Sequence, residues 1–419
     1  MIPKFNDYKV KWNVQSDDSI KPGLDAIERG LRLLNNPHKT LRVVHIAGTN
    51  GKGSTLMFLE NIARQHGLTV GKFMSPCILD VHDQIQVNGI PILQTEMDEV
   101  FSKLQRANLS GLLTDFELLT CAAFVHFNEK NVDLVLLEAG MGGREDSTNV
   151  IMPIVSIVTS IALEHTRFLG NTIQSIAYHK AGIIKEKKPI VIGALPKEAF
   201  DVVQMEANKM QSPLYCLGKD FDVITFNETE VYANKNTDIT IDCIQRSLPG
   251  QHQGDNMALA VTAFLEVAKS LQISIDKQKI RYGIKQTKIP GRFEQVLENV
   301  YFDGAHNPAS VGKLVETIKQ QFPNESIRFI IGMLTDKDVK SVLNILEQIS
   351  DEFYFVDFSN NRAMNAEEMM DMSNASKKQI IKDPISFLQQ SNSYNGKTFV
   401  TGSLYLLTEI REKLTHLDE

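Results

Sequence analysis

Runs of apolar residues alternate with amphipathic segments along most of this chain. Residues 43–47, 131–138 and 154–160 are almost continuously apolar, which is typical of strands buried on both faces of a parallel sheet. Residues 21–34 instead place leucine or isoleucine at every third or fourth position, which predicts a helix. The alternation of such strands with helices predicts an α/β fold, namely a doubly wound, mainly parallel sheet.

Polar residues mark where several of the expected helices begin. Thr114 is followed three residues later by Glu117, the spacing of a capping box, and Thr95 is followed in the same way by Asp98. The other expected elements are strands at 69–73 and 189–193, a loop and hairpin within 74–89, short antiparallel strands within 221–243, and helices at 55–66, 95–108, 172–181, 254–270 and 276–285.

A second alternation of predicted strands and helices begins after residues 288–294, which we expect to be a linker and hinge. Its first strand ends in Asp303-Gly-Ala-His-Asn-Pro and not in the Gly-x-Gly-x-x-Gly turn of dinucleotide-binding domains. We therefore predict a larger domain at 1–289, built on the phosphate loop described next, and a smaller Rossmann-like α/β domain at 290–419. The strands expected in the second domain are 300–303, 327–331, 352–356 and 398–401.

The stretch Val43–Ser54 combines a strand, a glycine-containing loop, a lysine and a hydroxyl, and then a helix. Glycines let backbone N–H groups turn toward phosphate oxygens, and the helix N-terminus adds a positive dipole end. Lys52 can reach the terminal phosphates. The loop is shorter than the general P-loop pattern, because Ile46 stands where a glycine is usual. A plain glycine turn is the alternative, but the pattern favours a site for nucleotide phosphates.

Composition and charge exclude several classes of function. The chain has 419 residues, of which 42% are hydrophobic and 23% charged, as in soluble globular proteins of two domains. Its net charge of −7 argues against general binding of nucleic acids or acidic membranes. The four cysteines are scattered, and no apolar signal or membrane-spanning run is present. We therefore expect reduced thiols and a cytoplasmic location.

The apolar run 131–138 ends in an acid, Glu138, which is followed by Ala-Gly-Met-Gly-Gly-Arg. In folds with a phosphate loop, an acid at the end of a core strand holds the magnesium ion of the nucleotide. An acid that caps an exposed strand end is the alternative. The phosphate loop upstream favours magnesium.

These motifs resemble those of the Mur ligase superfamily, and in particular its folylpolyglutamate synthase and dihydrofolate synthase branch. One such motif would be weak evidence, but these occur in the family's order over nearly the whole chain. The matching stretches are His45–Ser54, Ser75-Pro76, Thr114–Glu117, Glu138–Asn149, Thr159–His165, His179–Lys185, Leu248–Gln253 with Asn256, Pro290–Glu294, Asp303–Pro308 and Thr401–Ser403.

The resemblance implies an ATP-dependent carboxylate–amine ligase. A folate carboxylate attacks the γ-phosphoryl group of ATP, which gives an acyl phosphate and ADP, and the amine of L-glutamate then displaces phosphate. The cofactors implied are ATP and Mg²⁺, with two magnesium sites, and the acceptor is a folate or dihydropteroate. On the same ground we expect a monomer, and the net charge argues against nucleic acids and membranes as partners.

The resemblance also implies a role for individual residues. Lys180 matches a carbamylated lysine of the family, and the change has a physical reason. An ammonium beside two magnesium ions would be a like charge, whereas a carbamate can serve as a ligand. The sequence alone would make Lys180 a solvated helix residue and His165 a structural histidine. The implied catalytic residues are Lys52, His165, Lys180 and Arg292; the metal ligands are Ser75, Glu138, His165 and Lys180; the ATP contacts are Gly48, Thr49, Asn50, Gly51, Lys52, Gly53, Ser54, Asn256, Arg292, Asp303 and His306; and the substrate contacts are Thr114, Phe116, Asp146 and Ser147.

This chain has three departures from the family pattern, two of which lie on the folate side of the site. The family usually has Ser-Pro-His-Leu and then Asn-Glu-Arg-Ile, where this chain has Ser-Pro-Cys-Ile at 75–78 and His-Asp-Gln-Ile at 82–85. Both stretches lie in the loop that we expect to form a substrate lid. Glu164 stands where the family has aspartate before the metal histidine. We expect Cys77 to be a small packing residue, because amide ligation needs no nucleophilic thiol.

Other functions remain open at this stage. A Mur-type ligase for a different carboxylate, such as a cell-wall precursor, would need an extra N-terminal domain, and only about forty residues precede the phosphate loop. A nucleotide-dependent binding protein without ligation would leave Lys180 and Arg292 without a purpose. A nicotinamide dehydrogenase is opposed by the missing dinucleotide fingerprint. The sequence leaves open whether dihydropteroate, reduced folates or both are accepted.

Overall fold

The computed structural model describes residues 2–77, 79–226, 229–389 and 394–415, so that Ile78 of the expected lid lies outside the described residues. The chain divides into two compact units. The N-terminal unit comprises residues 1–247 and 253–287, and the C-terminal unit comprises 248–252 and 288–419. The predicted boundary between residues 289 and 290 lies close to this division.

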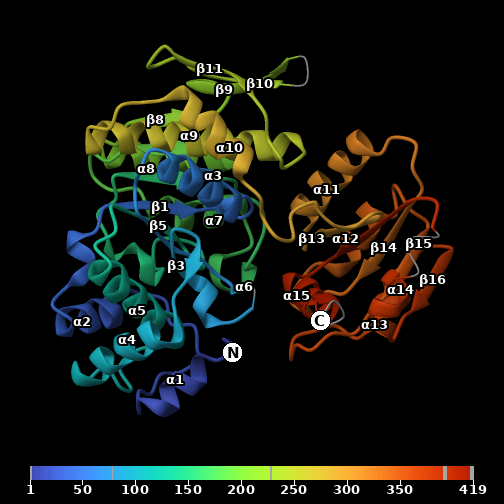
Figure 1. The fold of residues 1–419 in the computed structure, drawn as a ribbon, viewed down its shortest axis with the longest axis horizontal. Helices are drawn as coiled ribbons and strands as arrows, with labels where there is room; N and C mark the ends of the chain where they lie inside the picture. Colours follow the sequence, from blue (N-terminus) through green and yellow to red (C-terminus); the bar gives the residue numbers. More distant parts are fainter. Residues whose placement is uncertain (1, 78, 227–228, 390–393, 416–419) are drawn as a thin grey trace. The chain divides into compact units, whose positions relative to one another are not determined.

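The N-terminal unit is built around one large sheet of strands in the order β4-β3-β2-β5-β1-β6-β7-β8 (Figure 1). The strands from β2 to β8 in this order are parallel, whereas β3 and β4 form the predicted hairpin and pair antiparallel. Its turn is Asn88-Gly89, and both residues have a positive φ, which suits the twist of a tight hairpin. The bounds are β1 Val43–Ala47, β2 Val70–Phe73, β3 Ile85–Val87, β4 Ile90–Pro91, β5 Leu134–Glu138, β6 Val155–Val158, β7 Ile190–Ile192 and β8 Leu214–Cys216.

The central position of β1 determines which loops meet. Strand β1 lies between β5 and β6, and Ile46 is paired in register with Glu138 and with Ile157. The carboxyl ends of these three parallel strands therefore open on the same edge of the sheet. The phosphate loop, the loop after Glu138 and the loop that carries His165 all start from this edge.

Helices cover both faces of the large sheet. Figure 1 shows α3, α9 and α10 on one side of β1 and β5, with α2, α4 and α5 on the other. The helices are α1 Phe5–Lys11, α2 Asp25–Leu33, α3 Lys52–Gln65, α4 Gln94–Arg106, α5 Asp115–Glu129, α6 Thr166–Leu169, α7 Ile173–Ala181, α8 Lys197–Lys209, α9 Gln251–Leu271 and α10 Lys277–Gln286, with short 3₁₀ turns η1 Pro37–Thr40, η2 Val81–Gln84 and η3 Ser147–Val150.

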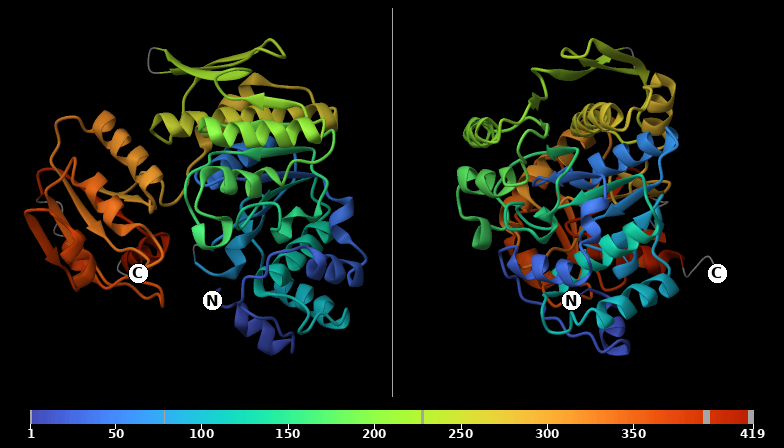
Figure 2. Two further views of the ribbon diagram at one scale, coloured as in Figure 1. Left: turned by 180° about the vertical axis from the view of Figure 1, so that it is seen from behind. Right: turned by 90° about the vertical axis from the view of Figure 1, so that its left-hand side faces the viewer.

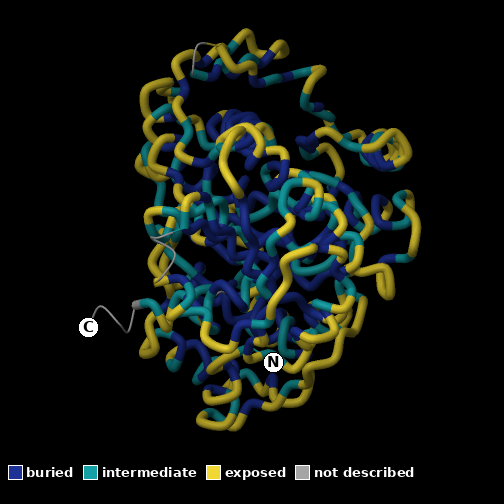
Figure 3. Tube along the Cα trace, turned by 90° about the vertical axis from the view of Figure 1, so that its right-hand side faces the viewer, coloured by how far each residue is buried: buried dark blue, intermediate teal, exposed yellow. Residues whose placement is uncertain are grey.

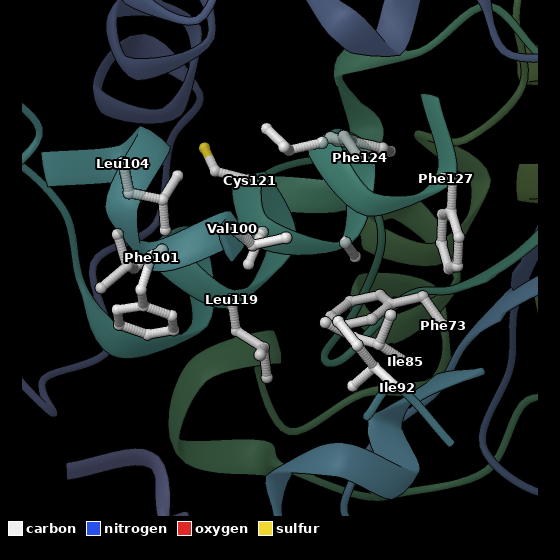
Figure 4. Packing of buried hydrophobic residues seen from close by; sticks show 14 of the residues in the cluster. Phe73, Ile85, Ile92, Val100, Phe101, Leu104, Leu119, Cys121, Phe124 and Phe127 are labelled. Atoms are coloured by element: carbon white, nitrogen blue, oxygen red, sulfur yellow. The ribbon is translucent and has the colours of Figure 1, made fainter. Parts of the chain in front are cut away.

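The core on the α5 side joins α1, α2, α4 and α5 to the sheet. Phe73 at the end of β2 packs there with Ile85 of β3 and Ile92, as Figure 4 shows. Phe101 of α4 and Phe124 of α5 belong to the same cluster. Because Phe73 and Ile85 flank the loop 74–84, the core fixes both ends of that loop.

A small antiparallel sheet, β11-β10-β9, forms a separate layer of the N-terminal unit, as the sequence predicts for 221–243. Figure 2 shows it beyond α9, away from the large sheet, and Figure 3 shows that buried, half-buried and exposed residues mix along it. Its strands are β9 Phe221–Phe226, β10 Thr229–Asn234 and β11 Ile239–Ile244.

The C-terminal unit has its own six-stranded sheet, in the order β12-β13-β17-β14-β15-β16, with β12 antiparallel and the other strands parallel. Aromatic residues such as Phe329, Phe353 and Phe399 fill one side of it. The predicted smaller α/β domain is thus confirmed as a fold. Its elements are β12 Glu294–Leu297, β13 Val300–Asp303, α11 Pro308–Gln321, β14 Ile327–Ile331, α12 Val339–Leu346, β15 Glu352–Phe355, α13 Ala366–Met372, β16 Lys377–Ile380, α14 Pro384–Gln389, β17 Lys397–Thr401 and α15 Leu404–Thr415.

One predicted helix start is wrong. The N-cap of α4 is Leu93 and not Thr95, because the carboxylate of Glu96 accepts a hydrogen bond from the Leu93 N–H at 2.9 Å. A leucine has no capping side chain, so the sequence pattern for an N-cap missed it. Helices α1 and α8 and strands β8, β12 and β16 also carried no signal strong enough to predict.

Candidate active site

The phosphate loop leads directly into helix α3. Gly51 is its N-cap, with a φ of 88°, and α3 begins at Lys52. The first hydrogen bond of the helix runs from the Thr55 N–H to the Gly51 carbonyl at 2.9 Å. The N–H groups of Lys52, Gly53 and Ser54 therefore precede the intrahelical ladder and can serve an anion at the helix N-terminus.

Two hydroxyls at the end of β6 hold the tip of this loop. Thr159 and Ser160 both donate to the Asn50 carbonyl, at 2.6 and 2.9 Å, and the Asn50 N–H donates back to the Ser160 hydroxyl at 2.9 Å. A Cβ on Gly48 would lie 1.9 Å from the Thr159 hydroxyl oxygen, so no larger residue fits there. The glycine is thus required for the close approach of the two loops.

Asn256 of α9 lies against the phosphate loop. A Cβ on Gly51 would approach the Asn256 amide oxygen to 2.3 Å, and Asn256 itself is buried. The structure therefore brings this distant residue to the loop, although its contact with adenine stays a prediction.

Lys52 and Glu138 meet at the carboxyl edge of the sheet. The Lys52 ammonium donates to the Gly48 carbonyl at 2.8 Å and lies 3.9 Å from a carboxylate oxygen of Glu138. Glu138 is almost fully buried at the end of β5. The lysine thus lies between the loop backbone and the acid, where it can meet a phosphate.

Lys180 is fully buried, and its ammonium donates to Glu164 at 2.8 Å. Burial lowers the pKa of Lys180 to about 8, although the Glu164 carboxylate partly offsets the effect. Burial alone would raise the pKa of Glu164, but the charges of Lys180 and Lys52 lower it to about 2. The prediction that the sequence alone would give, a solvated helix lysine, is wrong, because α7 turns this side chain inward.

Ser75 and His165 occupy loops at the same edge. Ser75 follows the end of β2, which is paired with β5, and Phe73 is in register with Leu137, the residue before Glu138. His165 is exposed and forms the N-cap of α6 in a left-handed backbone conformation. Over the described parts of the chain, no group of three or more His, Cys, Asp or Glu side chains could hold a metal ion. The proposed ligand set also draws on a serine and a modified lysine, so it stays a prediction.

Thr114 and Phe116 lie at the start of α5. Thr114 forms the predicted capping box, because its N–H and hydroxyl both donate to Glu117 at 2.8 Å. Phe116 lies against the loop after β5, since a Cβ on Gly140 would approach its ring to 2.6 Å. It also stacks near Phe73, with 5.7 Å between ring centroids. Phe116 is thus placed between β2 and the loop that follows Glu138.

Both carboxylate oxygens of Asp146 accept hydrogen bonds from its own loop. Its carboxylate accepts from the Met141 N–H at 2.8 Å and from the Thr148 hydroxyl at 2.6 Å. The Thr148 hydroxyl in turn accepts from the His45 ring, at 2.8 Å. Burial raises the pKa of Asp146, which these hydrogen bonds partly offset. The side chain therefore shapes the loop, and a contact with a pterin would come in addition.

Ser147 is buried beside Asp146, and its hydroxyl lies 3.0 Å from that of Thr120 in α5. The structure thus brings together Phe116, Asp146 and Ser147 around the loop after β5.

The residues that depart from the family pattern have structural partners. Cys77 is buried, and its burial raises its pKa to about 12, which agrees with a packing residue. Asp83 accepts from the Leu79 N–H at 2.6 Å. The amide of Gln84 donates to the Met74 carbonyl at 3.3 Å. His82 bridges Asp80 and Tyr8, each at 2.7 Å.

Arg292, Asp303 and His306 form a cluster within the C-terminal unit. Asp303, at the end of β13, accepts from the Phe293 and Ala305 N–H groups at 2.8 and 2.9 Å. Burial raises the pKa of Asp303, while the charge of Arg292 lowers it. A Cβ on Gly304 would lie 2.4 Å from the Arg292 guanidinium, and the His306 ring contacts the Gly304 carbonyl at 2.9 Å. The three predicted ATP contacts of this unit therefore lie together.

The sequence pattern missed three features of the site. These are the hydrogen bonds from Thr159 and Ser160 to Asn50, the ion pair of Glu164 with Lys180, and the hydrogen bond between Tyr8 and His82. The motif Thr159–His165 was a signal for the first two, since it places hydroxyls and an acid at a strand end. Tyr8 carried no signal.

In the described parts of the chain, no helix combines the length and the apolar composition that crossing a membrane requires.

Comparison with known families matches both halves of the chain. The model of the Mur ligase middle domain matches residues 46–264, and that of the Mur ligase glutamate ligase domain matches residues 291–395. The first alone spans more than half of the chain.

Individual proteins match over nearly their whole length. A protein of Bacillus subtilis named dihydrofolate synthase/folylpolyglutamate synthase is 39% identical over 412 residues, which cover 94% of this chain and 95% of the relative. A structure of E. coli FolC in complex with DHPP and ADP superposes with a TM-score of 0.90 at 27% identity and covers 99% of this chain and 98% of the other. A Mycobacterium tuberculosis folylpolyglutamate synthase complexed with ADP and AMPPCP gives a TM-score of 0.83 at 26% identity, with 94% and 95% covered.

Proposed function

This chain belongs to the Mur ligase family, in its folylpolyglutamate and dihydrofolate synthase branch, and we propose that it joins L-glutamate to a folate carboxylate at the expense of ATP. The observation that carries this proposal is the edge of the large sheet where the phosphate loop, Glu138 and buried Lys180 converge. The similarity to a structure with DHPP and ADP bound supports ATP and a folate-type acceptor as substrates. The alternatives of another carboxylate acceptor and of a binding protein without ligation are less well supported.

The first step joins two anions, so the site must supply positive charge. An oxygen of the folate carboxylate attacks the γ-phosphorus, the bond to the β,γ-bridging oxygen breaks, and ADP leaves. The N–H groups at the start of α3 and the ammonium of Lys52 stabilise the phosphate oxygens in this step. In the second step the glutamate amine attacks the acyl carbon, inorganic phosphate leaves and the amine proton is lost.

We propose that Mg²⁺ is held by Ser75, Glu138 and His165. The oxygens of Ser75 and Glu138 fit the ion in chemistry, because Mg²⁺ prefers hard oxygen ligands and Glu138 is a buried carboxylate at the strand end. The imidazole of His165 is included on the family resemblance. When bound, the ion neutralises phosphate charge.

We further propose that Lys180 becomes a carbamate. Its lowered pKa, about 8, increases the share of neutral amine, and the neutral amine is the form that adds CO₂ and then loses a proton. A carbamate beside Glu164 would place two anions together, which favours a cation between or near them. The check is ¹³C NMR of enzyme in ¹³C-bicarbonate, whose carbamate signal should be absent in Lys180→Arg.

Mass spectrometry of the products tests the function. The enzyme is incubated with MgATP and L-glutamate, and with either dihydropteroate or a reduced folate monoglutamate. Glutamate added in both tubes means a bifunctional enzyme, and in the second tube alone a polyglutamylating one. ADP without added glutamate in either tube would refute the proposal. A monomer is expected, which light scattering would check.

A further inference from the structure

We propose that Tyr8 and His82 form a link through which helix α1 positions the folate side of the site, so that both act as positioning residues for folate binding. The inference rests on the proposed function. It concerns the η2 turn, Val81–Gln84, and its N-cap Asp80.

The link is a continuous chain of hydrogen bonds. Asp80 accepts from the backbone N–H and the Nδ1–H of His82, at 2.9 and 2.7 Å, and pairs with Lys4 at 2.7 Å. Since Nδ1 donates to the carboxylate, Nε2 of a neutral ring is left as an acceptor. The hydroxyl of Tyr8 lies 2.7 Å from it and donates. The Val81 N–H also donates to the Pro3 carbonyl at 3.1 Å.

The α1 end of the link is buried and packed against α4. Tyr8 is buried, and its ring packs against Phe101 of α4 with 5.4 Å between centroids. Burial, together with the charges of Asp98, Asp80 and Asp7, raises the pKa of Tyr8 to about 12, so its hydroxyl keeps the proton that it donates. Trp12 of the same segment donates to Asp98 at 2.8 Å, which fastens α1 to α4.

The other end of the link reaches the site. Gln84 bonds Met74 in both directions, through its carbonyl at 3.1 Å and its side-chain amide at 3.3 Å. Met74 stands between Ser75 and Phe73, whose ring packs on Phe116. A displacement of the η2 turn would therefore move Ser75 and the aromatic pair.

The histidine at position 82 departs from the family pattern. The family pattern has asparagine at the position of His82. An imidazole presents its two nitrogens on separate sides of the ring, so one side chain bridges Asp80 and Tyr8, which an amide of asparagine is too short to do.

The test compares Tyr8→Phe, His82→Asn and the double variant in the full-length enzyme. We expect each single variant to raise KM for the reduced folate by about fivefold or more, the cost of one lost hydrogen bond to a positioned group. KM for MgATP should rise less than KM for folate, because β6 holds the phosphate loop and Ser75 is only one of the three proposed Mg²⁺ ligands. The double variant should be no worse than the worse single variant, since both cut the same link.

Lys11→Met is the matched control. Lys11 lies on the same helix but pairs with Asp98 of α4 at 2.7 Å and makes no contact with the η2 turn, so folate KM should not change. Tyr8→Phe removes one oxygen and keeps the ring, so the test survives if His82→Asn fails to fold. Unchanged folate KM in Tyr8→Phe, equal changes in both KM values, or additive effects would each overturn the link. A wild-type enzyme that adds no glutamate to folate would instead refute the proposed function.

Discussion

At the residue scale, the pair of Lys180 and Glu164 is the least ordinary feature of the site. A lysine that is 1% exposed needs a counter-charge, and Glu164 supplies it at 2.8 Å. Removing one partner of a buried pair leaves an uncompensated charge, which costs far more than the pair contributes. The two residues should therefore behave as a unit in stability measurements.

We predict that Glu164→Gln lowers the free energy of unfolding by about 3 kcal/mol at neutral pH in bicarbonate-free buffer, where Lys180 keeps its ammonium group. Urea denaturation followed by circular dichroism measures it. The matched control is Glu186→Gln, which removes an exposed pair with Lys187 and should change stability by less than about 0.5 kcal/mol. Equal effects of both substitutions would contradict a special role for the buried pair.

The contribution of Glu164 should also depend on pH. Its pKa is about 2 in the folded protein and 4.5 in the unfolded chain, so the folded state favours the charged form. The stability difference between wild type and Glu164→Gln should be fully present above pH 4.5 and disappear as the pH falls toward 2. A difference that grows on acidification would have the wrong sign.

At the scale of elements, the start of α5 serves both helix stability and the predicted substrate site. We predict that Thr114→Ala destabilises the protein by about 1 kcal/mol through loss of the cap, whereas Thr114→Ser retains it. Denaturation curves give the stability, and folate KM is measured alongside. Asp276→Ala, which removes the N-cap of α10, should cost as much stability without changing folate KM. If Thr114→Ser keeps the wild-type folate KM while Thr114→Ala raises it, the hydroxyl of Thr114, and not its methyl group, contributes to folate binding.

The contact of α3 with α10 connects packing to nucleotide binding. A Cβ on Gly283 would lie 2.9 Å from the backbone of Ile62, so the two helices would have to separate. We predict that Gly283→Ala costs about 1–3 kcal/mol and weakens ADP binding, because α3 begins at the phosphate loop. Calorimetric titration with MgADP measures the affinity. Gly312→Ala in α11, where an added Cβ meets nothing within 4 Å, should leave ADP affinity unchanged and should not lower stability, because alanine is the better helix former.

At the scale of the whole molecule, each unit has its own hydrophobic core. Lys52, Glu138, Lys180 and Asn256 belong to the N-terminal unit, whereas Arg292 and Asp303 belong to the C-terminal unit. We predict that a fragment of residues 1–287 folds and binds MgADP, but forms no ligation product. Circular dichroism, titration and product analysis test the three parts. Full ligation by the fragment would refute any catalytic role for Arg292.

The sequence by itself determined the α/β class, most strand positions, the capping box at Thr114 and the phosphate loop. Each of these depends on neighbours within a few residues, such as the period of apolar positions or the order glycine, lysine, glycine, serine. It failed locally where a helix begins without a capping side chain, as at Leu93.

The tertiary structure decided which distant residues share an environment. Asn256 meets Gly51, Glu164 meets Lys180, and His82 meets Tyr8, at separations in sequence that no periodicity encodes. The burial of Lys180 depends on how α7 packs on the sheet, and its pKa depends on that burial. Charge, protonation and close approach are thus set by packing between elements, whereas the elements themselves are set by local pattern.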